Sequence, residues 1–172
     1  MSVKRLTQMA MLTAISIVLA IFVRFPLFPA APWMLYDPAD VPIFVGTLLF
    51  GPGAGLAMAG VAGLIVHQGG PLGIIMHFAS TGGFVLVAGL LYRFRKTPAS
   101  AAVALLVATA ATCAIMVGLN LLVVPLFAPA MDWQDVVPMI LPVILPFNAL
   151  KYTANSVLAY VLWRLLQKYR FI

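Results

Sequence analysis

Six apolar stretches fill most of this chain, and they limit the folds that it can adopt. Only 8% of its 172 residues are charged, against roughly a quarter in a soluble domain. The length suits about six spans of ~20 residues with short loops, so we expect one membrane domain over residues 1–172. The stretches predict helices over roughly 7–24, 41–51, 53–68, 71–92, 101–124 and 143–164. We therefore predict an all-α integral membrane protein, a bundle of six transmembrane helices.

Charged side chains are sorted between the two sides of these predicted helices. All four acids, Asp37, Asp40, Asp132 and Asp135, fall on one side. Since cytoplasmic loops are rich in Lys and Arg, we expect both termini to face the cytoplasm of the cell. The net charge of +6 follows this topology and does not indicate nucleic acid as a partner. Eight of the ten basic residues share the predicted cytoplasmic side: Lys4, Arg5, Arg93, Arg95, Lys96, Arg164, Lys168 and Arg170.

Residues 25–40 connect the first two predicted helices and have an unusual composition. Four prolines rule out a continuous helix, because each removes a donor and restricts the residue before it. The segment is also too apolar for a solvated loop. We expect an ordered extracellular loop that folds down onto the bundle as a lid over a binding site, where irregular backbone is tolerated. The alternative is an interfacial belt of aromatic residues.

Lys151 lies in the middle of the last apolar stretch, where a cation costs a few kcal/mol on insertion scales. No acidic residue is near it in the sequence, so its side chain is expected to face a polar cavity or a ligand. Asn148 and Asn155, three residues before and four after, share its helical face. This polar stripe is the strongest indication of function in the chain.

Asn120 and Asn148 are expected at comparable depth, each near a proline at the outer edge of its helix. A carboxamide offers a donor and an acceptor side by side, so two of them with an ammonium can recognise a planar heterocycle. Nearby aromatic residues would supply a stacking or apolar wall: Trp33, Tyr36, Phe147 and Tyr152. The alternative for the asparagines is ordinary hydrogen bonding between helices.

Several kinds of chemistry lack the residues that they need. Cys113 is the only cysteine, so neither a disulfide framework nor a cysteine metal cluster is expected. His67 and His77 lack metal or haem spacing and are interpreted as packing residues near the outer surface. Without a nucleophile pair or a P-loop, the chain is predicted to be neither an enzyme nor an ATPase, and no cofactor is expected. Arg24 and the residues after it lack a cleavage site, so the first helix is expected to be retained.

Ala10 and Ala14 have the small-xxx-small spacing that lets another helix approach closely. Two interpretations remain open for this face of the first helix. It either packs inside the bundle or docks a partner subunit.

Four segments carry a resemblance that covers nearly the whole chain. The chain resembles the substrate-binding S components of energy-coupling factor (ECF) vitamin transporters, and its second and fourth segments are most similar to the riboflavin-specific members. The segments are Ala10-x-x-x-Ala14, Tyr36-Asp37-Pro38-Ala39-Asp40-Val41-Pro42, Gly51-Pro52-x-Ala54-Gly55 and Pro146-Phe147-Asn148-Ala149-Leu150-Lys151.

The resemblance implies a high-affinity vitamin-binding subunit that takes riboflavin from outside the cell. It implies three partners: a transmembrane coupling subunit, which would dock on Ala10 and Ala14, and two cytoplasmic ATP-binding subunits. An S component for pantothenate or a folate-like vitamin remains an alternative, as does a small membrane protein without a transport role. The implied substrate contacts are Asn120, Asn148, Lys151, Asp37, Asp40, Tyr36 and Trp33.

Overall fold

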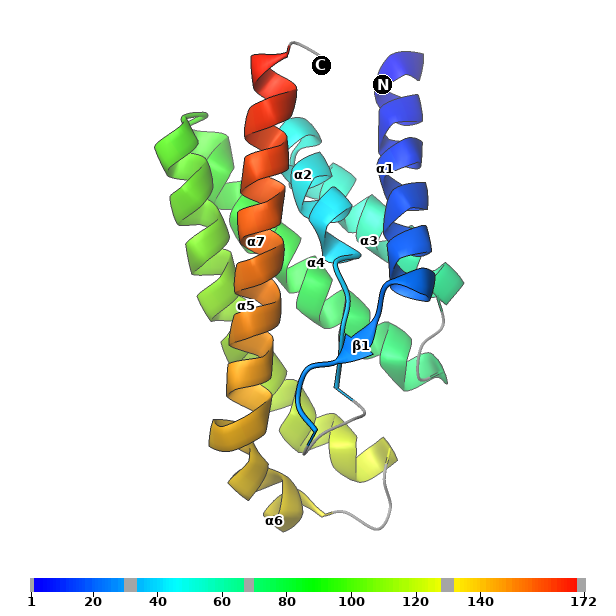
Figure 1. Cartoon of the computed structure of the whole chain (residues 1–172), viewed down its shortest axis with the longest axis vertical. Coiled ribbons are helices and arrows are strands. Elements are labelled where there is room, and N and C mark those ends of the chain that lie inside the picture. The colour runs from blue at the N-terminus through cyan, green and yellow to red at the C-terminus, as the bar shows by residue number, and fades with distance from the viewer. Residues whose placement is uncertain (1, 30–33, 67–69, 128–131, 170–172) are drawn as a thin grey trace.

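The computed structural model describes residues 2–29, 34–66, 70–127 and 132–169, and these residues are mostly helical (Figure 1). Their arrangement confirms the predicted all-α membrane class, and the helix ends differ from the predicted bounds by a few residues. The six longer helices are α1 (Val3–Phe22), α2 (Asp40–Phe50), α3 (Pro52–Val66), α4 (Gly70–Phe94), α5 (Pro98–Phe127) and α7 (Leu145–Lys168). A short helix α6 (Trp133–Val136), a 3-10 turn (Val137–Met139) and a π-helical turn (Ile140–Ile144) lead into α7.

The longer helices fall into two groups by length. Among the described residues, α1, α4, α5 and the segment that ends in α7 are long and apolar enough to cross a membrane. The other two, α2 and α3, are shorter apolar helices. The 11 residues of α2 extend only about 16 Å, as its early end at Gly51-Pro52 predicted. A helix surrounded by protein need not match the bilayer thickness, and α2 is buried from Asp40 to Leu48.

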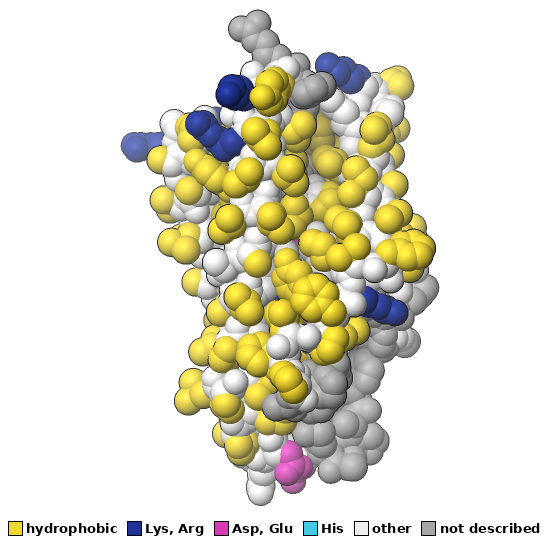
Figure 2. Space-filling model, in the orientation of Figure 1, with side chains coloured by type: hydrophobic (Ala, Val, Ile, Leu, Met, Phe, Trp, Pro, Cys, Tyr) yellow, Lys and Arg dark blue, Asp and Glu magenta, His cyan; other side chains and the backbone are white. Residues whose placement is uncertain are grey.

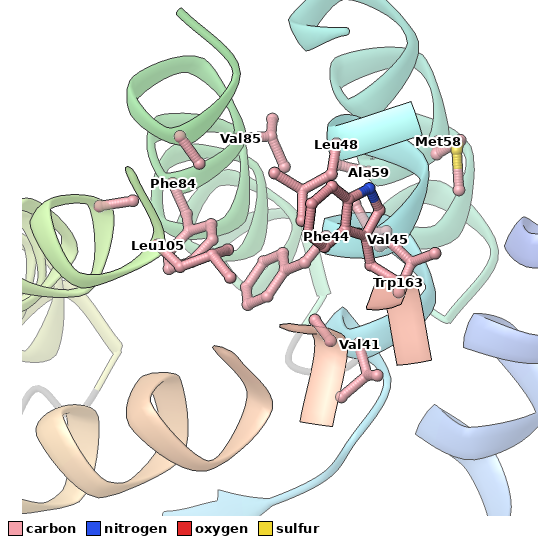
Figure 3. Close-up of a cluster of buried hydrophobic side chains, with 14 of the residues drawn as sticks. Val41, Phe44, Val45, Leu48, Met58, Ala59, Phe84, Val85, Leu105 and Trp163 are labelled. Carbon is pink, nitrogen blue, oxygen red and sulfur yellow. The ribbon is translucent and has the colours of Figure 1, made fainter. Parts of the chain in front are cut away.

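The hydrophobic core is built around α2, against which α1, α3, α4 and α7 pack. Phe44 of α2 stacks on Phe84 of α4 with ring centroids 3.7 Å apart, and Phe84 in turn stacks on Tyr152 of α7 at 5.6 Å. Figure 3 shows Met58 of α3, Leu105 of α5 and further side chains gathered around the same helix. The central position of α2 explains why it carries almost no polar face.

Close contact between α2 and α3 depends on a glycine. A Cβ atom at Gly55 would lie 2.1 Å from Oγ1 of Thr47 and 3.0 Å from Cβ of Val85. No side chain fits at that position without moving α3 away from α2 and α4. The Gly- and Ala-rich composition of α3 therefore has the tight-packing role that such residues have in membrane helices.

The connection between α1 and α2 contains a small antiparallel ribbon that the sequence did not predict. Strands β1 (Phe25–Pro26) and β2 (Leu35–Tyr36) pair Phe25 with Tyr36 and Pro26 with Leu35. The ribbon lies against the bundle beside α7 (Figure 1), so the described part of the loop is folded onto the helices as expected. Residues 30–33, including Trp33, lie outside the described residues.

The two ends of the bundle differ in charge. Helix α1 begins and α7 ends at the same end of the molecule, and α6 lies at the opposite end (Figure 1). Figure 2 shows Lys and Arg side chains gathered near the end with the termini, an acidic side chain at the other end, and apolar side chains over most of the surface between them. This distribution is typical of a bundle that crosses a bilayer.

Candidate ligand-binding site

A cavity of about 240 Å³ lies below the α1–α2 connection, in the half of the bundle away from the termini. It exists because α2 is short: α2 begins at Asp40, and the space beyond its first residue is enclosed by the connection and five surrounding helices. The wall is mixed, with carboxylate, ammonium, amide, imidazole and hydroxyl groups among apolar side chains. The lining residues are Ser16, Ala20, Leu35, Asp37, Ala39, Ala62, Gly63, Val66, Gly73, Met76, His77, Ser80, Thr81, Met116, Phe147, Asn148, Lys151 and Tyr152.

Lys151 lines this cavity, but it does not lie there without a counter-charge. Its Nζ is 2.9 Å from Oδ2 of Asp37 and 3.9 Å from Oδ2 of Asp40. Lys151 is expected from the sequence to face a polar cavity or a ligand, and it does line this cavity; the two carboxylates beside it are distant from it in the sequence. The two carboxylates come from the α1–α2 connection and the start of α2. The ion pair therefore lowers the cost of a cation at this depth.

Asp40 belongs to a second set of contacts behind the cavity wall. It is 2% exposed at the start of α2, where a negative charge is favoured by the helix dipole. Its Oδ1 accepts a hydrogen bond from the Thr81 hydroxyl at 2.9 Å. The side chain thus connects α2 to α4 and orients the acidic side of the Lys151 cluster.

Asn155 ties the connection to α7. Its Oδ1 accepts a hydrogen bond from the Tyr36 hydroxyl at 3.0 Å, and its Nδ2 donates to the Asp37 carbonyl at 3.1 Å. Burial raises the pKa of the Tyr36 phenol above its usual value, and the adjacent Asp37 carboxylate raises it further. The phenol therefore remains a proton donor at neutral pH. From α1, Ser16 donates to the Ala39 carbonyl at 2.7 Å, so the connection is held from both sides.

The two asparagines differ in their relation to the cavity. Asn148 is 2% exposed and lines it, while its Nδ2 donates to the Ile144 carbonyl at 2.8 Å. Asn120 is also buried and donates to the Met116 carbonyl at 2.7 Å. Met116 lines the cavity, and Asn120 lies one turn further along α5, beyond the lining residues. Each amide is thus oriented by its own helix, but only Asn148 reaches the wall.

His77, which the sequence predicts to be a packing residue near the outer surface, packs against Gly63 of α3 and also lines the cavity. It lines the cavity from α4, opposite α7, and its Nε2 is buried without a hydrogen-bond partner among the described residues. Gly63 of α3 makes room for the ring, since a Cβ there would lie 2.7 Å from His77 Cδ2. The sequence alone does not show that Gly63 and His77 face each other, so it could not predict that the ring reaches the cavity wall. His67 lies outside the described residues.

Aromatic residues close the cavity on the side of α7. Phe147 lines the wall and meets Phe28 of the connection edge-on, with centroids 6.4 Å apart. Tyr152 lines the wall at the end of the Phe44–Phe84 stack. Tyr36, expected as part of an aromatic wall, instead packs against Phe25 at 5.4 Å. Among the described residues, the phenyl and phenol rings that line the cavity, Phe147 and Tyr152, therefore both come from α7.

Ala10 and Ala14 lie on the exposed face of α1. The opposite face, with Met9 and Thr13, is buried where α1 packs on α2 and α3. Within the described part of the chain, the other helices therefore leave these two alanines exposed.

Comparisons with known proteins agree with this architecture. Residues 4–163 match the family model of the ECF transporter, substrate-specific component. The chain is 31% identical to the riboflavin transporter RibU of Staphylococcus aureus (strain TCH60), with 96% of this chain and 92% of that protein covered. It is 32% identical to the riboflavin transporter FmnP of Bacillus subtilis (strain 168), with 88% and 85% covered.

A solved structure of the S component of a bacterial ECF transporter has the same fold. It superposes with a TM-score of 0.81 at 31% sequence identity, and 96% of each chain is covered. Sequence family, curated relatives and three-dimensional structure thus point to one assignment. This multi-pass membrane protein belongs to the family of ECF transporter substrate-specific components.

Proposed function

We propose that this chain is a riboflavin-binding S component and that the cavity below the α1–α2 connection holds the vitamin. The observation that carries the proposal is the mixed wall, in which Asn148 and Lys151 of α7 face the same space as His77 of α4. A planar heterocycle with carbonyl and N–H groups on its edge matches such amide, ammonium and imidazole groups. The relatives named as riboflavin transporters support the same ligand.

The wall residues have different proposed roles. Asn148 and Lys151 contact the polar edge of the flavin, and the aromatic rings of Phe147 and Tyr152 pack against its faces. Asp37 holds the Lys151 ammonium in place, and it remains a candidate contact for the ligand. Asn120 would contact a part of the ligand that extends along α5 past Met116.

Three further residues are proposed to serve the site from the connection and the start of α2. Tyr36 and Asp40 are proposed to shape the wall through their bonds to Asn155 and Thr81. Trp33 is retained as a proposed contact from the connection.

The charge distribution supports a direction of transport. With the basic end of the bundle in the cytoplasm, as the positive-inside rule favours, the cavity lies in the outer half of the membrane. Riboflavin would then enter from outside and lie beneath the connection. A transmembrane coupling subunit would dock on the Ala10 and Ala14 face, and two cytoplasmic ATP-binding subunits would drive release to the inside.

The experiment is a titration of detergent-purified protein with riboflavin, followed by the vitamin's own fluorescence. We expect saturation at one riboflavin per chain, without displacement by an excess of pantothenate or folate. Binding of pantothenate or folate in place of riboflavin would assign the chain to another vitamin. Binding of none of the three would contradict a role in vitamin uptake.

A further inference from the structure

A second cavity, of about 470 Å³, lies at the other end of α2, where the two termini are. It is enclosed by Arg5 at the start of α1, the α2–α3 turn around Gly51, and Arg93 and Lys96 at the end of α4. We call it the basal cavity. The length of α2 separates the basal cavity from the cavity below the α1–α2 connection, which we call the vitamin cavity. The proposed function gives the basal cavity no role.

The basal cavity has an excess of positive charge that no acidic side chain among the described residues balances. Arg5, Arg93 and Lys96 line it, and no acidic residue does. The chain has only four acids. Two of them pair with Lys151 in the vitamin cavity. The other two, Asp132 directly before α6 and Asp135 within it, lie at the opposite end of the bundle (Figure 1). None of the acidic side chains that the structure describes therefore neutralises the basal cavity.

Arg5 is held in an orientation that leaves one donor unused. Its Nη2 donates to the Phe50 carbonyl at the end of α2, and its guanidinium carbon lies 5.5 Å from the centroid of the Phe50 ring. These contacts cover a helix C-terminus that would otherwise repel an anion. The Arg5 Nε is buried and has no hydrogen-bond acceptor among the described residues. A guanidinium offers its N–H groups in a planar fork that matches phosphate oxygens.

The start of α3 adds a further feature that favours an anion. Gly51, with φ of 92°, turns the chain so that the 15-residue helix α3 begins at Pro52, on the cavity wall. The positive end of its helix dipole is therefore directed to the same region as the three cations. A Cβ on Gly89 would lie 2.7 Å from Pro52 Cβ, so α4 packs directly on this turn and keeps Arg93 close to it.

The surroundings favour a lipid over a soluble anion. Leu6, Leu90 and Phe94 are neighbours of the cavity residues along α1 and α4, and their side chains are exposed. In a membrane-spanning bundle these apolar side chains contact acyl chains, while the cations at the end of the helices reach the headgroup level. We propose that the basal cavity binds the phosphate group of an anionic phospholipid from the leaflet on the side of the termini.

The test compares phosphatidylglycerol with phosphatidylcholine carrying the same acyl chains. The detergent-purified full chain is mixed with equal amounts of the two lipids, and bound lipid is counted by native mass spectrometry. We expect the wild-type protein to retain phosphatidylglycerol in preference. The variant Arg93→Gln/Lys96→Gln should lose about 25-fold of that preference, since each basic residue at an anionic surface contributes roughly 5-fold. Arg5 is left unchanged because its bond to Phe50 also supports α2.

The matched control is Arg164→Gln/Lys168→Gln, which removes two cations from the same end but outside the cavity. It should keep the wild-type preference, and equal thermal unfolding temperatures would show that both double variants fold. Equal retention of the two lipids by the wild type would overturn the proposal. An equal loss in both double variants would also overturn it, because the effect would then be the general positive field. Displacement of the lipid by millimolar inorganic phosphate would assign the site to a soluble phosphate and refute the lipid.

Discussion

At the scale of single residues, Lys151 has two proposed roles: it pairs with Asp37, and it contacts the ligand. A single substitution of Lys151 would change both at once. The ammonium is paired with Asp37 at 2.9 Å, and both side chains keep 16% exposure. Replacing either partner leaves the other charge partly buried and uncompensated. We expect Lys151→Gln and Asp37→Asn each to lower stability, and the double variant to lose less than the sum by about 0.5–3 kcal/mol. Thermal unfolding of the four proteins of this cycle measures the coupling, and additive losses would mean that the pair is energetically irrelevant.

The riboflavin affinities of the same four proteins distinguish the pairing of Lys151 with Asp37 from a direct contact of Lys151 with the ligand. If Lys151 only positions Asp37 and the connection, the double variant should recover binding together with stability. We expect instead that binding stays weak in the double variant, because the ammonium itself contacts the vitamin.

His77 provides the second prediction at this scale. Its buried Nε2 has no hydrogen-bond partner among the described residues, so the burial of this nitrogen costs stability. We expect His77→Leu to leave the unfolding temperature unchanged or higher, while weakening riboflavin binding roughly 5- to 150-fold through one lost hydrogen bond. A variant that binds riboflavin as well as the wild type would exclude the imidazole from the site.

The sequence patterns could not predict which residues contact Lys151 and Asn155. The one-face arrangement of Asn148, Lys151 and Asn155 follows from helical spacing and could be predicted. The partner of Lys151 is 114 positions away in the chain, and no periodicity connects a loop carboxylate with a helix that far along. The role of Asn155 as a clamp on the connection was hidden for the same reason.

At the scale of elements, the short helix α2 and the folded connection together create the cavity. The end of α2 at Gly51-Pro52 was readable because glycine and proline mark a turn. The ribbon of β1 and β2 was not, because strands of two residues have no alternating pattern long enough to detect. The π-helical turn before α7 was likewise not expected from the proline-rich stretch that contains it.

The clamp formed by Asn155 gives a prediction about this connection. Tyr36→Phe removes one hydrogen bond and Asn155→Ala removes two, so the connection should be held progressively less firmly on α7. We expect riboflavin to dissociate faster in both variants, with the larger effect in Asn155→Ala. Stopped-flow fluorescence measures the dissociation rate.

Limited proteolysis from the outer side supplies an independent readout of the same element. Riboflavin should protect the connection in the wild type, and the protection should weaken in the order Tyr36→Phe, then Asn155→Ala. Equal cleavage of the wild type with and without riboflavin would count against a lid role.

At the scale of the whole molecule, the two cavities lie toward opposite ends of the bundle, and α1 presents an exposed face along the side of the bundle. A Trp at Ala14 should prevent close approach of a partner helix and forfeit the dispersion contacts along that seam. We expect Ala14→Trp to stop co-purification with the coupling subunit while riboflavin binding is kept. Leu106→Trp, on an exposed position of α5, is the matched control and should retain both. Retention of the coupling subunit by Ala14→Trp would remove this face from the interface.

The measurement that tests the account most directly is the riboflavin dissociation constant of Asn148→Leu. Leucine has a similar size, so the change removes the amide from the cavity wall without opening a large void. Thr153→Val is the control, because Thr153 lies on the exposed side of the same helix. We predict a loss of roughly 5- to 150-fold in affinity for Asn148→Leu at an unchanged unfolding temperature, and no loss for Thr153→Val. Wild-type affinity in a folded Asn148→Leu protein would contradict the claim that riboflavin binds in this cavity.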